Sequence, residues 1–96
     1  MQRIIKEGTW KYSETHFEKI ILVEQDWDQF YEEGYSEDEP YLNSDGLVYY
    51  LYFGDYQYNE HRIISSRSIS IPFLSSNEAM IHAESEMQGV KWNEED

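Results

Sequence analysis

Two aspartates, Asp26 and Asp28, followed by Glu37, form the pattern in this 96-residue chain that comes nearest to a metal site. They fall on the first, third and twelfth positions of the calcium-loop template, where carboxylate oxygens bind the ion. The match then fails, because Phe30 stands at a ligand position and Tyr31 stands where the loop requires glycine for its sharp turn. We therefore expect Asp26 to cap a helix, and we predict no metal site.

The other chemistry-bearing residues also lack the spacing that ligation or catalysis requires. His16, His61 and His82 are scattered and form no HxxxH or HExxH pattern, and the chain contains no cysteine. The serines of residues 65–70 show no GxSxG elbow, and no glycine-rich phosphate loop is present. We expect a non-catalytic protein without a cofactor.

The charge distribution is the main functional signal in the sequence. Twenty Asp and Glu against seven Lys and Arg give a formal net charge of −13, and no basic residue occurs between Lys19 and Arg62. Such a field repels nucleic-acid phosphates and anionic membranes and attracts a basic partner. Carboxylates along this stretch can imitate a phosphate backbone, which favours a basic protein as the partner, bound as an inhibitor or immunity protein would be. The alternative is a solvated acidic loop that keeps the domain soluble.

Two surfaces are candidates for binding. The acidic segment, residues 26–45, combines aromatic anchors with carboxylates, as interface hot spots do. A tyrosine-rich sheet face is the second candidate, because one helix cannot cover both faces of the sheet and open apolar surface favours self-association as a homodimer. The expected contact residues are Trp27, Tyr31, Glu32, Glu33, Tyr35, Glu37, Asp38, Glu39 and Tyr41 on the acidic segment and Val48, Tyr50 and Tyr52 on the sheet face.

A small-molecule-binding or enzymatic domain is the alternative function. Its pocket would lie between the acidic loop and the sheet, with Asp26, Asp28, Asp45 and His61 as its polar groups. A closed pocket of this kind would show thermal stabilisation by a specific compound at fixed salt. Binding to a basic partner would instead weaken as salt rises.

The strands that would position these residues are organised around residues 47–53, LVYYLYF, a run that is apolar on both faces and predicts a central strand. Residues 16–25 are also apolar on both faces at their middle, at residues 20–23, and predict a second interior strand. We pair them with a weaker strand at residues 3–12, in which Gly8 marks a bulge or an irregular entry into the strand. Residues 61–73 alternate between apolar and polar side chains and predict one long strand.

Two helices complete the expected order of elements. Asp26 and Gly34 can cap the two ends of a helix of about two turns that groups Trp27, Phe30 and Tyr31 on one face. A capping box at residues 75–78 starts a helix over residues 76–88. The apolar stripe of this second helix consists of Ala79, Met80, Ala83 and Met87.

The predicted fold is a single α+β domain over residues 1–96, in the order strand, strand, short helix, strand, strand, helix. It has two layers, an antiparallel sheet of about four strands and the C-terminal helix packed on one face. Residues 93–96 form a frayed acidic tail. The absence of cysteine, of a signal-peptide pattern and of a membrane-spanning run predicts a soluble cytoplasmic protein.

Overall fold

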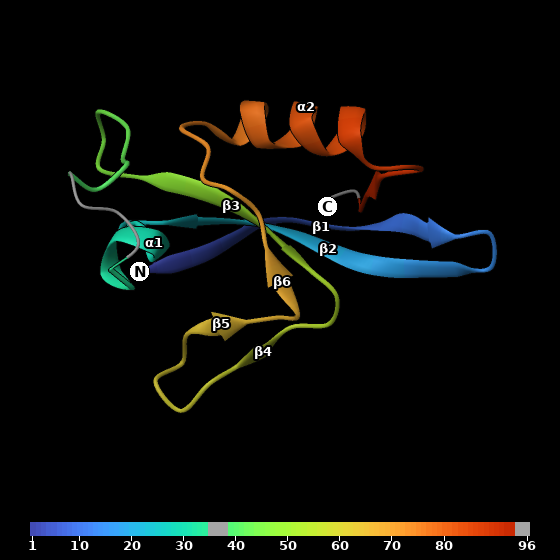
Figure 1. Cartoon of the computed structure of the whole chain (residues 1–96), viewed down its shortest axis with the longest axis horizontal. Helices are drawn as coiled ribbons and strands as arrows, with labels where there is room; N and C mark the ends of the chain where they lie inside the picture. The colour runs from blue at the N-terminus through green and yellow to red at the C-terminus, as the bar shows by residue number, and fades with distance from the viewer. Residues whose placement is uncertain (35–38, 94–96) are drawn as a thin grey trace.

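The computed structural model describes residues 1–34 and 39–93, except for the side chain of Phe30 (Figure 1). Five strands form an antiparallel sheet in the order β6-β3-β2-β1-β7, and β4 pairs with β5 in a separate hairpin. The α+β class is therefore confirmed, but the order of elements differs from the predicted one. In chain order the elements are β1 (Gln2–Ser13), β2 (His16–Gln25), α1 (Gln29–Glu32), β3 (Val48–Phe53), β4 (Gln57–Tyr58), β5 (Ile64–Ser65), β6 (Ser68–Ile69), α2 (Ser76–Glu86) and β7 (Lys91–Trp92).

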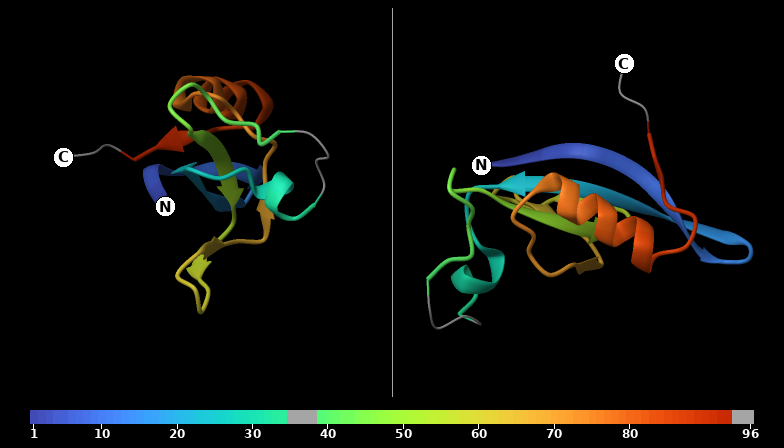
Figure 2. Two further views of the ribbon diagram at one scale, coloured as in Figure 1. Left: turned by 90° about the vertical axis from the view of Figure 1, so that its left-hand side faces the viewer. Right: turned by 90° about the horizontal axis from the view of Figure 1, so that it is seen from above.

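Strands β2 and β3 form the centre of the sheet, and their alternate side chains enter two separate cores. They pair from Ile20 opposite Phe53 to Gln25 opposite Val48. Helix α2 covers one face and the β4–β5 hairpin lies on the other (Figure 2). The buried members of the α2-side core are Ile20, Leu22, Leu51, Phe73, Ala79 and Ala83, and those of the hairpin-side core are Ile21, Val23, Val48, Tyr50, Tyr52 and Ile64.

Strand β1 pairs with β2 as the predicted hairpin, but its irregularities are at Ile5 and, beside the turn, at Tyr12, and not at Gly8. The register shifts between Ile4 and Lys6, so Ile4 packs on the hairpin-side core while Ile5 packs on the α2-side core. Gly8 pairs regularly with both β2 and β7. A Cβ atom at Gly8 would collide with the carbonyl oxygen of Lys91. Glycine is therefore required here because the edge strand β7 approaches β1 so closely.

Helix α2 begins as predicted. The Ser75 hydroxyl accepts a hydrogen bond from the Glu78 N–H at 3.1 Å, while the Glu78 carboxylate accepts one from the Leu74 N–H at 3.3 Å. The helix ends at Glu86, two residues before the expected end. None of the helices in the described ranges has the length and apolarity needed to cross a membrane. The predicted stripe is confirmed, since the residues that pack on the sheet are Ala79, Met80, Ala83 and Met87.

The long strand predicted over residues 61–73 is wrong. This stretch forms β5 in the hairpin, β6 beside β3, and a single bridge between Phe73 and Tyr49. The chain passes from one side of the sheet to the other, because Ile64 fills the hairpin-side core and Phe73 fills the α2-side core. The stretch is divided because β5 pairs with β4 outside the main sheet, whereas β6 and Phe73 pair with β3 within it.

We predict that Gly8→Ala lowers the free energy of unfolding by about 1–3 kcal/mol, because the added methyl group overpacks the contact between β1 and β7. Urea denaturation measures this loss, and amide hydrogen exchange should show reduced protection of the residues in β7. Thr9→Ala, at the next and exposed position, is the control and should cost less than about 1 kcal/mol. Equal stability of Gly8→Ala and the natural chain would contradict the close approach.

Candidate functional site

The carboxylate of Asp28 is the anchor of the acidic segment. Asp28 is only 3% exposed. Its Oδ1 accepts hydrogen bonds from the Tyr31 N–H at 3.3 Å and from the Tyr50 hydroxyl at 3.0 Å, and its Oδ2 accepts one from the Tyr41 N–H at 2.8 Å. The Tyr50 hydroxyl in turn accepts from the Gln29 N–H at 3.0 Å. One carboxylate thus fastens both sides of the acidic segment to strand β3.

The first helix is shorter than predicted, and a different aspartate caps it. Helix α1 spans Gln29–Glu32, a single turn, and Asp28 receives the capping hydrogen bond from Tyr31. Asp26, the expected cap, accepts a hydrogen bond at 2.8 Å from the amino group of Met1. That hydrogen bond holds the pKa of Asp26 below its ordinary value. The capping residue is therefore Asp28, two residues after the expected one. Its carboxylate accepts from a backbone N–H group of the first turn of α1, whereas the carboxylate of Asp26 accepts from Met1.

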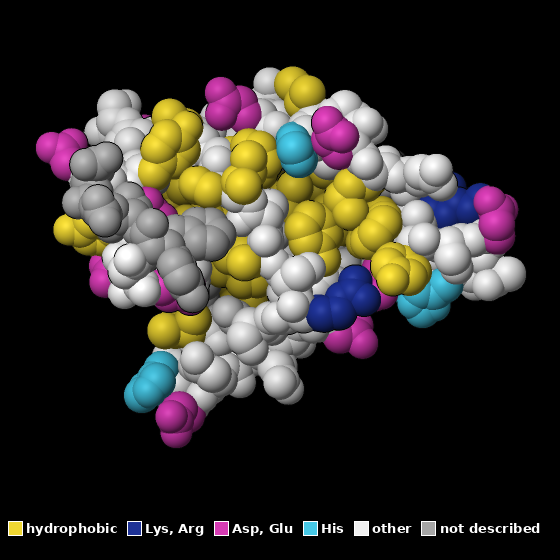
Figure 3. Space-filling model, viewed as in Figure 1, with side chains coloured by type: hydrophobic (Ala, Val, Ile, Leu, Met, Phe, Trp, Pro, Cys, Tyr) yellow, Lys and Arg dark blue, Asp and Glu magenta, His cyan; other side chains and the backbone are white. Residues whose placement is uncertain are grey.

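Aromatic and acidic side chains are displayed together around α1. We call the exposed residues Tyr31, Glu32, Glu33, Glu39 and Tyr41 the α1 surface. The two tyrosines are 38% and 47% exposed. None of the three carboxylates forms an ion pair within the part of the chain that the structure describes. In the view of Figure 3, the end of the molecule where α1 lies shows acidic side chains and no Lys or Arg.

The other residues expected on the acidic segment have different outcomes. Trp27 is half-buried, and its carbonyl oxygen accepts a hydrogen bond from the Gln25 side chain at 3.1 Å. Tyr35, Glu37 and Asp38 lie outside the described residues. The prediction for the acidic segment therefore rests on the α1 surface alone.

The expectation of an open tyrosine-rich sheet face is wrong. Val48, Tyr50 and Tyr52 are all buried in the hairpin-side core. The cover is supplied by Ile64 of the β4–β5 hairpin and by Tyr56, which directly precedes β4. These three side chains therefore leave no apolar surface through which a second copy could dock.

A buried polar network at the end of the sheet was missed by sequence reasoning. The side-chain oxygen of Gln25 accepts hydrogen bonds from Gln2 at 3.0 Å and from the Tyr52 hydroxyl at 3.1 Å. Gln2 also accepts from the Ile64 N–H at 2.9 Å, which ties the hairpin to β1. Burial raises the pKa of Tyr52 to about 12 and also raises the pKa of Tyr50. The available signal was the uncharged polar side chain of Gln25, which shares a strand face with the apolar residues Ile21 and Val23.

The polar groups of the alternative pocket are not brought together. Asp28 is buried under its own hydrogen bonds, and Asp26 binds the amino group of Met1. Asp45 is exposed in the turn before β3, and His61 is exposed in the loop between β4 and β5. Asp28 thus turns inward, whereas His61 lies on the surface of the hairpin loop. Within the described residues, no three His, Asp or Glu side chains gather as a possible metal site.

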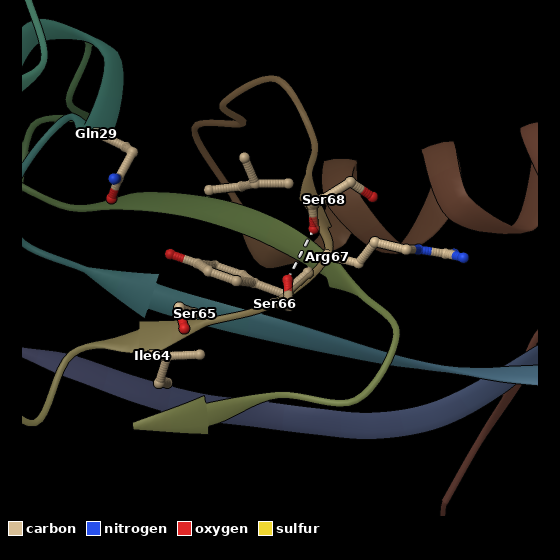
Figure 4. Close-up of a pocket in the computed structure, with 8 residues that line it drawn as sticks. Gln29, Ile64, Ser65, Ser66, Arg67 and Ser68 are labelled. Carbon is tan, nitrogen blue, oxygen red and sulfur yellow. Dashed lines mark hydrogen bonds between the residues drawn. The ribbon is translucent and has the colours of Figure 1, made fainter. Parts of the chain in front are cut away.

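A hollow does lie between α1 and the corner that joins β5 to β6 (Figure 4). Its volume is about 180 Å³. The Ser66 hydroxyl donates to the Ser68 carbonyl oxygen at 2.8 Å, whereas Arg67 extends out of the hollow and pairs with Glu18 at 2.9 Å. The lining is therefore rich in hydroxyl and amide groups. Its residues are Gln29, Tyr52, Ile64, Ser65, Ser66, Arg67, Ser68 and Ile69.

We predict that Asp28→Asn lowers the free energy of unfolding by about 1–3 kcal/mol, the cost of leaving a buried polar group unpaired. Backbone N–H groups face both oxygens, so the amide NH₂ must meet a donor whichever way the side chain is turned. Urea denaturation measures the loss, and the Tyr31 or Tyr41 amide resonance should shift. Asp45→Asn, on the exposed turn, is the control and should stay within about 0.5 kcal/mol. A neutral effect of Asp28→Asn would contradict the anchoring role.

A second prediction concerns alkaline pH. The raised pKa of Tyr52 means that the unfolded chain loses its proton first, so this contribution to stability is complete below pH about 10 and is lost as pH rises toward about 12. Urea denaturation at a series of pH values should show the decline in this window. Tyr52→Phe should be less stable at neutral pH but should lose less of its stability across the same window. An identical decline in both proteins would contradict the prediction.

Comparison with known proteins finds no matching family model, no matching curated protein and no matching solved structure. The geometry of the chain itself therefore provides the basis for a functional proposal.

Proposed function

We propose that this protein is a small, non-catalytic interaction domain that binds a basic protein partner through the α1 surface. The observation that carries the proposal is the anchoring by Asp28, whose carboxylate bonds to the N–H groups of Tyr31 and Tyr41 and to the Tyr50 hydroxyl. These bonds hold both sides of the acidic segment against the sheet. A fixed surface loses less conformational entropy on binding than a free loop would.

The charges of the α1 surface favour a basic partner. Glu32, Glu33 and Glu39 are exposed and are not neutralised by any cation within the described ranges. Acidic charges of this kind speed association with a positively charged protein and exclude acidic competitors. Tyr31 and Tyr41 add large amphipathic side chains, which are enriched at the centres of interfaces. The combination suits recognition of a basic, partly apolar surface.

The hollow beside α1 supports a second candidate function, the binding of a small polar compound. Its volume of about 180 Å³ lies below the range of roughly 300–1,000 Å³ in which ligand pockets usually fall. Its lining also has no pair of carboxylates that could serve as acid and base. We therefore rank the protein interaction first.

We predict that Glu32→Gln combined with Glu33→Gln weakens binding to the captured partner by roughly 2- to 30-fold, because each exposed charge pair contributes about 0.2–1 kcal/mol. The tagged protein would be used to capture partners from a lysate at about 0.05 M and 0.5 M salt, a range that strongly shortens the screening length. Isothermal titration with the purified partner would then give the affinity.

The matched control is Glu84→Gln combined with Glu86→Gln, which removes the same charge from the exposed side of α2. This control should bind as tightly as the natural chain. Equal weakening by both pairs of substitutions would show only a general charge effect. Capture of no basic protein, or of one whose binding resists both salt and Glu32→Gln/Glu33→Gln, would refute the proposed docking surface.

A further inference from the structure

The loop between β4 and β5 holds an arginine in a backbone conformation that normally belongs to glycine. The Arg62 N–H donates to the Asn59 carbonyl oxygen at 2.9 Å, and the Asn59 side-chain oxygen accepts from the N–H groups of His61 and Ile63 at 2.8 and 3.0 Å. This pattern forms a three-residue hairpin loop whose last residue is left-handed. Arg62 accordingly has φ of 61°.

Arg62 is the exception among the left-handed residues of the described ranges. The other positions with positive φ there are Gly34, Gly46, Gly54 and Gly89. A non-glycine residue is strained in this conformation because its Cβ atom crowds the following carbonyl oxygen, and strain of this kind concentrates where a side chain serves a function. The Arg62 side chain is exposed and forms no ion pair within the described part of the chain. Its guanidinium group is therefore available to a ligand.

Arg62 lines a groove at the loop end of the β4–β5 hairpin. The groove has a volume of about 300 Å³, and Trp27 and Tyr58 contribute the aromatic part of its lining. Arg62 and Tyr58 also line a second hollow of about 380 Å³. The complete lining of the groove is Met1, Gln2, Trp27, Tyr58, His61, Arg62 and Ile63.

The walls of this groove are held in place by the polar network and by aromatic packing. Gln25 donates to the Trp27 carbonyl oxygen at 3.1 Å, and Gln2 accepts from the Ile64 N–H at 2.9 Å. The Tyr58 ring packs edge-on against Tyr56 at 6.1 Å between ring centroids. A groove formed in advance loses little entropy when a ligand enters.

We propose that this groove binds a small aromatic carboxylate, with the carboxylate on Arg62 and the ring against Trp27 and Tyr58. A guanidinium group matches a planar carboxylate through two parallel hydrogen bonds, and flat aromatic side chains favour a flat ring. The net charge of −13 repels anions in proportion to their charge, so a singly charged carboxylate is favoured over a ligand with several negative charges. This site is independent of the α1 surface.

The test is a titration of the natural chain with indole-3-acetate, followed by the backbone and indole N–H resonances. We expect saturable shifts at Trp27, Arg62 and Ile63. Indole, which lacks the carboxylate, and acetate, which lacks the ring, should each bind at least about tenfold more weakly. Adenosine monophosphate, which carries more negative charge, should also bind more weakly than indole-3-acetate.

Arg62→Gly is the most informative variant, because glycine adopts the left-handed conformation readily and the turn therefore stays folded. It relieves the left-handed strain, so the urea midpoint should rise, while affinity for indole-3-acetate should fall by about tenfold or more. Arg62→Lys keeps the charge without the planar fork and should show an intermediate affinity.

Several results would overturn the proposal. These are shifts that map away from the groove, unchanged affinity in Arg62→Gly, or acetate binding as tightly as indole-3-acetate. Tighter binding of adenosine monophosphate would overturn the assignment to a carboxylate. A lower urea midpoint for Arg62→Gly would overturn the strain argument.

Discussion

Strands β2 and β3 are apolar on both faces, and the rest of the structure follows from the need to cover each face. Within the described ranges of this 96-residue chain, α2 is the one helix longer than a single turn, and it covers one side. The other side is covered by a two-stranded hairpin and by the polypeptide that follows β2. Burial of apolar surface is the dominant favourable term in folding, so leaving either face open would forfeit much of the stability of so small a domain.

The hairpin-side core introduces a second constraint, because it is built partly from tyrosines. The hydroxyl groups of Tyr50 and Tyr52 are buried with their rings, and a buried hydroxyl without a partner is costly. Asp28 and Gln25 provide those partners at the end of the sheet. The residues that satisfy the core therefore also decide where the acidic segment leaves the sheet and how its tyrosines and carboxylates face solvent.

This coupling separates two kinds of acidic residue in one segment. Asp28 is used internally as a hydrogen-bond acceptor, whereas Glu32, Glu33 and Glu39 are exposed and form no ion pair among the described residues. Arg62 also departs from the usual residue preference, because it occupies a left-handed position of the hairpin loop at which glycine is the more stable residue. Natural sequences tend to depart from local conformational and charge preferences at functional positions. The exposed carboxylates of the α1 surface and the left-handed Arg62 therefore both mark surfaces worth testing.

The sequence by itself determined the elements that depend on neighbouring residues: the apolar central strands, the β1–β2 hairpin, and helix α2 with its Ser75 cap and apolar stripe. Each is specified by periodicity or by groups only a few residues apart. Only the tertiary structure decided that residues 61–73 divide between two cores, that the bulge is at Ile5, and that Asp28 and not Asp26 turns inward. These outcomes depend on which distant segments meet. The choice between two aspartates, for example, rests on the hydroxyl of Tyr50, which is 22 residues away in the chain.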